Sequence, residues 1–177
     1  MSKSFESISD VVSWRLCLGC GVCVQVCPEG ALTLVNVEDD GLRPRRDNDK
    51  CAHCGECLNV CPGIAITAPE AHPEALQKLR RSWGNVLEIW EGYAADPDIR
   101  FRGSSGGIAT ALSLFAIEKL GMQGALHIGA DEKDPLANAA VISRNRTELL
   151  ERTGSRYAPA APCSGLNLLD ADGAPYV

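Results

Sequence analysis

The sequence predicts an α+β protein of two unequal parts, and three observations carry that prediction. Eight of the nine cysteines lie between Cys17 and Cys61, in two copies of one pattern that are offset by 34 residues. Between the copies, two β-rich runs flank a polar turn. After residue 86, strand-like apolar runs alternate with helix-like ones, which is typical of a mixed α/β layer.

Each copy of the cysteine pattern reads C-x-x-C-x-x-C-x-x-x-C-P. This run holds cubane iron–sulfur clusters in two-cluster bacterial ferredoxins, where the fourth cysteine of each run ligates the other cluster. The spacing therefore predicts a ferredoxin-like domain with two [4Fe-4S] clusters. The expected ligands are Cys17, Cys20, Cys23 and Cys61 for one cluster, and Cys51, Cys54, Cys57 and Cys27 for the other.

Other uses of the cysteines explain less of the pattern. A structural zinc site needs four ligands and leaves the third cysteine and the Cys-Pro of each run without a role. A disulfide framework accounts for neither the repeated spacing nor the two prolines. We expect His53 to be a loop residue near a cluster rather than a ligand. The ninth cysteine, Cys163, is expected to be a small buried hydrophobic residue.

Local patterns divide the first part and the linker into elements. A short amphipathic helix is expected over residues 5–16, and a hairpin over 31–37 and 42–46 with its turn at 39–41. The repeat continues past the cysteines, although Gly30 in the first copy corresponds to Ile64 in the second. A helix over 73–82 is expected to end at Gly84. The expected domains are 1–68 for the ferredoxin-like domain, 69–85 for a linker helix and 86–177 for the second domain.

The second part is expected to contain three strands and two helices. The strands are placed at 86–94, 124–130 and 137–143, with a turn at 96–98. A glycine-serine loop over 100–107 is expected to open a helix that runs to about Leu120 and ends at Gly121. Because this helix is apolar nearly all round, it should be buried. Thr147 is expected to cap a short helix.

The glycine-serine loop has properties of an anion site. Its backbone N–H groups precede a helix N-terminus, and Arg100 and Arg102 are close in sequence. A phosphate or a flavin pyrophosphate is one interpretation of this loop. A tight turn that requires small residues is the other, and the residue chemistry alone leaves both open.

Three segments carry a resemblance to a known family. Arg102–Leu112, Gly124-Ala125 and Thr153–Pro159 together resemble the N-terminal region of the coenzyme F420 hydrogenase/dehydrogenase beta-subunit family. The resemblance implies a flavin-dependent oxidoreductase subunit that passes electrons between iron–sulfur clusters, FAD and a deazaflavin or similar acceptor. It also implies a second motif at Arg156 and Tyr157. The residues implied to lie near the flavin are Arg102, Gly103, Ser104, Ser105, Gly106 and Gly107.

The resemblance further implies that the mixed α/β domain is incomplete here, because family members continue well past the position of Val177. Tyr176-Val177 is expected to begin a strand. On this reading the flavin site is completed by the later part, and the chain alone is not expected to turn over substrate. The alternative function is a non-catalytic, ferredoxin-type electron carrier or docking module.

Charge and hydropathy limit the partners. The net charge is −6 with no run of five like charges, so a nucleic acid or an anionic membrane has no electrostatic support. The longest apolar stretch, 108–117, is shorter than the roughly 20 residues that span a bilayer, and no signal peptide is recognisable. We expect a cytoplasmic protein whose partners are other oxidoreductase subunits or a redox partner protein.

Overall fold

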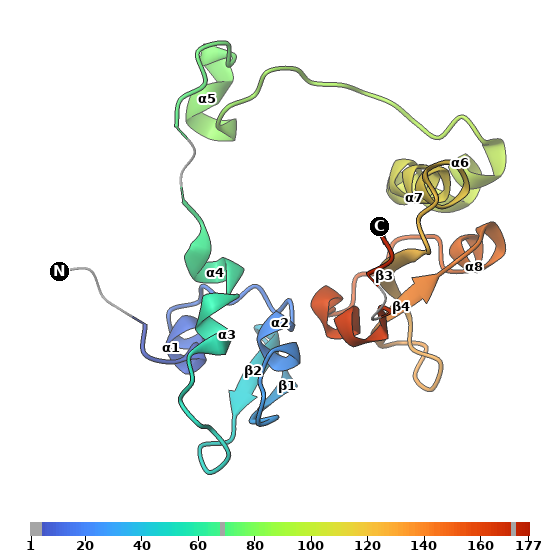
Figure 1. Ribbon diagram of the computed structural model, residues 1–177. Helices are drawn as coiled ribbons and strands as arrows, with labels where there is room; N and C mark the ends of the chain where they lie inside the picture. The colour runs from blue at the N-terminus through green and yellow to red at the C-terminus, as the bar shows by residue number, and fades with distance from the viewer. Residues whose placement is uncertain (1–4, 68–69, 171–172) are drawn as a thin grey trace.

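The computed structural model describes residues 5–67, 70–170 and 173–177, which form an N-terminal lobe, a linker and a C-terminal lobe (Figure 1). The N-terminal lobe comprises residues 5–67 and the C-terminal lobe residues 94–177. Figure 1 shows the linker rising from the first lobe, through one helix, and arching over to the second. Both lobes mix helices with a small antiparallel sheet, so the expected α+β class is confirmed.

The N-terminal lobe begins with helix α1, Ile8–Ser13. The expected helix over 5–16 is shorter than predicted because Ser7 starts it: the Ser7 N–H donates to the Asp10 carboxylate at 2.8 Å, in a capping box. Ile8 and Val11 of α1 are almost completely buried and pack against cysteines of both repeats. Helix α1 therefore supplies the apolar side chains against which the cysteines of both repeats pack.

The hairpin between the repeats is present as predicted. Strand β1, Leu32–Val37, pairs antiparallel with β2, Gly41–Arg46, in a register that runs from Leu32 opposite Arg46 to Val37 opposite Gly41. Gly41 takes φ 76°, which a side chain would disfavour at this turn. Leu32 is buried and contributes to the same core as α1.

The internal duplication is visible in the backbone. Helix α2, Val22–Gln25, and helix α3, Glu56–Asn59, are offset by the same 34 residues as the cysteines, and each follows a left-handed glycine. The copies diverge after their last cysteines. The first makes a turn at Gly30, with φ 57°, whereas the second continues into helix α4, Pro62–Ala65. The Gly30-to-Ile64 difference in sequence thus marks a real difference in structure.

The linker contains helix α5, Gln77–Trp83, which starts later than predicted and ends at Gly84 as predicted. The strand expected over 86–94 is wrong, because this segment has no regular structure. Among the described residues, sheet pairing joins only β1 to β2 and β3 to β4, so no neighbouring strand supplies partners for this backbone. Its large aromatic and aliphatic side chains are mostly exposed, with Trp90 at 86% and Ile89 at 74%.

The C-terminal lobe opens with helix α6, Pro97–Gly103, where a turn had been expected. The Asp96 carboxylate accepts bonds from the N–H groups of Asp98 and Ile99 and caps the helix, and Pro97 occupies a first-turn position that suits it. A short 3-10 turn η1, Ser104–Gly106, then joins α6 to α7, Gly107–Leu120. Helix α7 ends at Gly121, as predicted.

The expected burial of α7 is wrong. Gly107, Leu114 and Ala116 are buried, but Leu112 and Phe115 remain 62% and 53% exposed. The helix packs against α6 and against α8, Arg146–Glu151, and these cover only one of its faces. Helix α8 is capped by Asn145, whose side chain accepts from the Glu148 N–H, and not by Thr147 as predicted.

Two predicted strands form the sheet of this lobe. Strand β3, Ala125–Ala130, pairs antiparallel with β4, Asn138–Ser143, with Ala125 opposite Ser143. A core of small and aliphatic side chains lies between the sheet and the helices; its buried members are Ala94, Ile99, Leu114, Ala125 and Leu149. A further 3-10 helix that was not predicted, η2, Pro162–Leu168, contacts both strands.

The chain also returns to the open edge of β3. The Val177 N–H donates to the Gly124 carbonyl at 3.0 Å, and the Val177 carbonyl accepts from the Leu126 N–H at 2.9 Å. This alternation is the bonding pattern of a parallel strand pair. Residues 175–177 therefore lie as an extended segment beside β3, in keeping with the expectation for Tyr176-Val177. None of the helices in the described ranges is long and apolar enough to cross a membrane.

Candidate functional site

The eight repeat cysteines line two hollows in the N-terminal lobe. Each hollow receives three cysteines from one repeat and the last cysteine of the other. The first is lined by Cys17, Cys20, Cys23 and Cys61, together with Ile8, Pro44 and Gly63. The second is lined by Cys27, Cys51, Cys54 and Cys57, together with His53 and Leu58. We call these sets the first and second quartets.

Short helices and glycines give the quartets their shape. Cys23 lies in α2 and Cys57 in α3, while the earlier cysteines of each repeat lie in the loop before the helix. Gly63 is packed so closely that a Cβ there would lie 2.3 Å from the Leu16 carbonyl oxygen and 3.6 Å from Cys61 Sγ. The wall of the first hollow at this point requires glycine.

The donor set fits iron–sulfur clusters. All the cysteines are free thiols, and thiolates are the ligands that such clusters use. Backbone amides already point at two of the sulfurs, because Gly19 donates to Cys17 Sγ at 3.4 Å and Ala31 donates to Cys27 Sγ at 3.3 Å. In the ranges described, no three His, Cys, Asp or Glu side chains gather closely enough to hold a single metal ion. The sulfurs of each quartet are instead distributed around a hollow.

The electrostatics of the first quartet disfavour bare thiolates. Burial raises the pKa of Cys23 to about 12, and the neighbouring sulfurs of Cys17, Cys20, Cys57 and Cys61 add to the rise. In the second quartet, burial likewise raises the pKa of Cys57. Four ionised sulfurs in this space repel one another, so they need a bound cationic centre to compensate their charge.

The two quartets differ in exposure. Cys23 and Cys61, both in the first quartet, are each only 6% exposed, whereas Cys54 of the second quartet is on the surface. His53 lies at the edge of the second hollow, with an exposed side chain and φ 54°. It lies in the loop near the second quartet, where we expected it.

Cys163 is not the buried hydrophobic residue that we expected. It is half-buried in η2, and its N–H donates to the Cys20 carbonyl at 2.9 Å. Burial, and to a smaller extent the neighbouring Cys20 sulfur, raise the pKa of Cys163. Nothing in the local sequence indicated this contact, which joins the two lobes.

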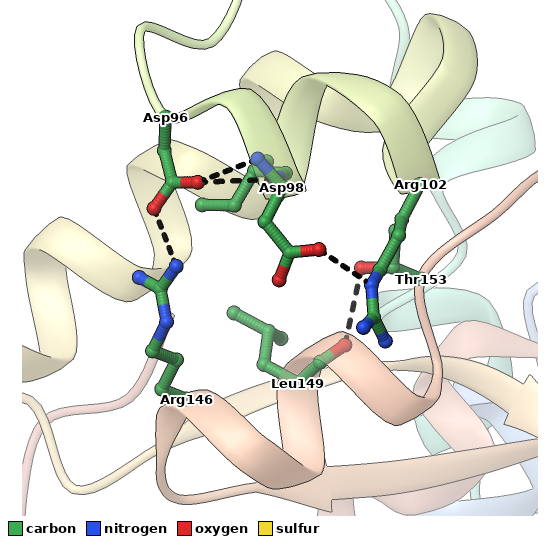
Figure 2. Close-up of polar contacts among 7 residues, drawn as sticks. Asp96, Asp98, Arg102, Arg146, Leu149 and Thr153 are labelled. Atoms are coloured by element: carbon green, nitrogen blue, oxygen red, sulfur yellow. Dashed lines mark hydrogen bonds and ion pairs between the residues drawn. The ribbon is translucent and has the colours of Figure 1, made fainter.

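The glycine-serine segment is a helix junction rather than an open loop. Gly103 ends α6, Ser104 adopts φ 47°, and Gly107 begins α7. Positive φ at a serine is uncommon, and residues with such strained backbones cluster at active sites and ligand-binding segments. The two arginines proposed for an anion already have partners. Arg102 Nε donates to the Asp98 carboxylate at 2.8 Å (Figure 2), and the Arg100 guanidinium lies 3.8 Å from the centre of the Tyr93 ring.

The junction and the start of α7 contact the Thr153–Pro159 segment of the family resemblance. Ser105 Oγ lies 3.5 Å from Ser155 Oγ, and Thr110 Oγ1 lies 3.3 Å from Thr153 Oγ1. Thr153 is fixed in turn by donating to the Leu149 carbonyl, as Figure 2 shows. Segments about 50 residues apart in sequence thus come together at one place in the C-terminal lobe.

An open cavity of about 430 Å³ lies beside this meeting point, between residues 130–135 and 151–156. Both charge signs line it: Arg152 and Arg156 lie there together with Asp131, Glu132 and Glu151. Arg156 bonds to Asn138 and to the Pro135 carbonyl, at 2.5 and 2.7 Å, so it tethers the loop between β3 and β4. Tyr157 is 94% exposed.

Two family models match the chain. Residues 16–65, which contain all eight repeat cysteines, match a 4Fe-4S dicluster domain. Residues 89–167, which contain the α6–α7 junction, the second motif and Cys163, match the N-terminal region of the coenzyme F420 hydrogenase/dehydrogenase beta subunit. No curated protein matches the chain.

Proposed function

We propose that this chain, which matches a 4Fe-4S dicluster domain over residues 16–65 and the beta-subunit N-terminal region of the coenzyme F420 hydrogenase/dehydrogenase over residues 89–167, is an electron-transfer subunit. It relays electrons through two [4Fe-4S] clusters to or from FAD and a coenzyme F420-like acceptor. Each expected domain has one proposed role. Residues 1–68 hold the clusters, residues 69–85 form the linker, and residues 86–177 contribute to flavin binding.

The observation that carries the proposal is the crossed composition of the two quartets. A run of four cysteines that served one centre would line one hollow with all four of its sulfurs, whereas here the fourth, Cys27 or Cys61, faces the other repeat's hollow. Two-cluster ferredoxins exchange their fourth ligand in this way. We assign the first quartet to one cluster and the second quartet to the other.

A bound [4Fe-4S] cluster supplies one-electron transfer. The chain's own residues hold it through thiolates, donate N–H groups to sulfur from Gly19 and Ala31, and keep water away with Ile8 and Leu32. Hydrogen bonds and solvent exclusion are the means by which a protein adjusts a cluster's potential. No proton-transfer group is needed for this task.

For FAD we propose the α6–α7 junction, residues 102–107, together with the adjoining Thr153–Arg156 segment. The family match, the left-handed Ser104 and the contact between Ser105 and Ser155 support this choice. The N-terminal end of α7 offers a partial positive charge to a pyrophosphate. Other oxidoreductase subunits are the proposed partners, and the exposed second quartet is the side that we expect them to approach.

One set of contacts favours the alternative of a flavin-free electron carrier. Arg102 and Arg156 are already bound within the chain, by Asp98 and by the β3–β4 loop. FAD titration of the full chain, alone and with its partner subunits, separates the two functions. Saturable quenching of flavin fluorescence that weakens in Arg102→Gln supports the flavin site, with Asp98→Asn as the matched control that frees the arginine. A complete lack of FAD uptake in all samples leaves the carrier function.

The cluster assignment has its own test. Iron and acid-labile sulfide should each reach about eight per chain, as two cubanes require. Cys27→Ser should alter the spectrum of the cluster held by Cys51, Cys54 and Cys57, and Cys61→Ser that of the other. If each substitution instead affects the cluster of its own repeat, the crossed assignment is refuted. Bound zinc in place of iron would refute the cluster function itself.

A further inference from the structure

One short element connects the first quartet to the C-terminal lobe. On one side, η2 packs against β3 and β4, and Gly165 makes this possible: a Cβ there would lie 2.7 Å from both Ala140 Cβ and Leu126 Cδ1. Helix η2 is therefore held tightly by the sheet of its own lobe.

The other side of η2 faces the cysteine loop. It packs against α2, where the Gln25 side chain donates to the Ser164 carbonyl at 3.2 Å. The Cys163 N–H donates to the Cys20 carbonyl at 2.9 Å, which holds Cys163 beside this cysteine of the first quartet. We call these contacts of η2 with Cys20, Gly21 and Gln25 the seam.

The seam touches only one of the two repeats. Cys20, Gly21 and Val22 line the first hollow, so the seam lies against the wall of the first quartet. The equivalent residues of the second repeat, Cys54 and Gly55, belong to the second hollow and leave Cys54 exposed. The two quartets are thus distinguished by what surrounds them, although their sequence patterns are the same.

We propose that the seam makes the first cluster the one that exchanges electrons with the C-terminal lobe, and that Cys163, held beside Cys20 by its backbone N–H, is a positioning residue whose thiol donates to the Cys20 sulfur in the cluster-loaded protein and sets the potential of that cluster. The inference rests on the proposed function, since it assumes a cluster on the first quartet. The second cluster is then the outer one, which faces the partner.

The physical effect of Cys163 has a definite sign. A thiol hydrogen that points at a ligating sulfur stabilises negative charge on that sulfur. Reduction adds one negative charge to the cluster, so the bond favours the reduced form and raises the midpoint potential. Loss of the donor should lower the potential of the first cluster and leave that of the second unchanged.

The test is a redox titration of the cluster-loaded full chain, followed by electron paramagnetic resonance. Cys61→Ser and Cys27→Ser identify which signal belongs to which quartet. Cys163→Ala should move the midpoint potential of the first cluster to a more negative value. Cys163→Ser, which keeps a donor, should lie closer to the parent. Ser164→Ala is the matched control, because its hydroxyl bonds to the Ala161 carbonyl within its own lobe.

A failure of the role of Cys163 is distinguishable from a failure of the proposed cluster function. Equal potentials in Cys163→Ala and the parent, or equal shifts in both clusters, overturn the role of Cys163 while the clusters remain. A chain without two clusters, or with uncrossed ligands, overturns the proposed function before Cys163 is tested.

Discussion

Gly21 and Gly55 occupy equivalent places in the two cysteine repeats and share a left-handed backbone, with φ 84° and 81°. Their surroundings differ completely. A Cβ on Gly55 would meet nothing within 4 Å, whereas one on Gly21 would lie 3.2 Å from both Ala161 Cβ and Leu34 Cδ1. Both positions favour glycine because the backbone is left-handed, but close packing against η2 adds a second reason at Gly21 alone.

Gly21→Ala should therefore weaken the seam, and Gly55→Ala should not. Both substitutions incur about 1 to 2 kcal/mol for a left-handed alanine, and Gly21→Ala adds about 1 to 3 kcal/mol of overpacking. Alkylation of Cys163 in the cluster-loaded chain, followed by mass spectrometry, reports seam opening. Faster labelling is expected in Gly21→Ala only. Equal labelling rates in the two variants would show that Ala161 does not press on this position.

Asp96 should matter to the C-terminal lobe in two separable ways. It caps α6 through two backbone N–H groups, and it forms an ion pair with Arg146 of α8 (Figure 2). Asp96→Asn keeps a capping oxygen but loses the ion pair, and Asp96→Ala loses both. The thermal unfolding midpoint should fall slightly in Asp96→Asn and further in Asp96→Ala. Identical midpoints for the two variants would mean that the cap contributes nothing.

The stability of the same lobe should fall in mild acid because of His127. Its Nε2 lies 2.8 Å from the hydroxyl of the fully buried Ser143, and Nδ1 faces the Ile128 carbonyl. Since a carbonyl only accepts, the neutral ring donates from Nδ1 and accepts from Ser143. Burial, and to a smaller extent Arg152, lower the pKa of His127 below its usual 6.5.

Because the folded state holds the proton less tightly than the unfolded state, the stabilisation is complete above about pH 6.5 and is lost as the pH falls through the folded pKa. Urea unfolding at a series of pH values should show this loss in the parent and a flatter profile in His127→Gln. The exposed His53 and His72 remain in the variant as internal controls. A profile that is unchanged by the substitution would assign the acid sensitivity to carboxylates instead.

The second cluster should be the first to be lost in air. Cys54 is exposed, whereas Cys23 and Cys61 of the first quartet are nearly inaccessible. Solvent access is what allows oxidants to reach sulfur and iron. Timed exposure of the anaerobic holoprotein to oxygen should bleach the signal that Cys27→Ser perturbs before the signal that Cys61→Ser perturbs. The reverse order would contradict the difference in exposure.

Local chemistry made much of this structure predictable. The hairpin β1–β2 and the ends of α5 and α7 depend on glycines and turn residues within a few positions, and the sequence displays these directly. Cysteine spacing likewise predicted which cysteines lie together around each hollow, and their role as cluster ligands stays a prediction. The start of α6 was missed, because Asp96-Pro97 suits a turn as well as a helix start.

The remaining features depend on parts of the chain that meet only after folding. Among the residues that the structure describes, the segment 86–94 has a strand-like composition but no partner strand, and α7 keeps apolar side chains such as Leu112 and Phe115 exposed. Cys163 is the clearest case, because its neighbour Cys20 lies near the other end of the chain. A single sequence carries no signal for such a contact.

During synthesis, the contacts of the seam can form only after the N-terminal lobe has been made. All eight repeat cysteines have been made by residue 61, and their hollows, α1 and the hairpin need nothing beyond the N-terminal lobe. The seam requires Cys163 and Ser164, about a hundred residues later. Since lobes of this kind fold in turn as the chain emerges, cluster insertion can precede docking of η2. With that order, the loop that carries Cys20 would be uncovered during delivery of iron and sulfide, and η2 would cover it afterwards.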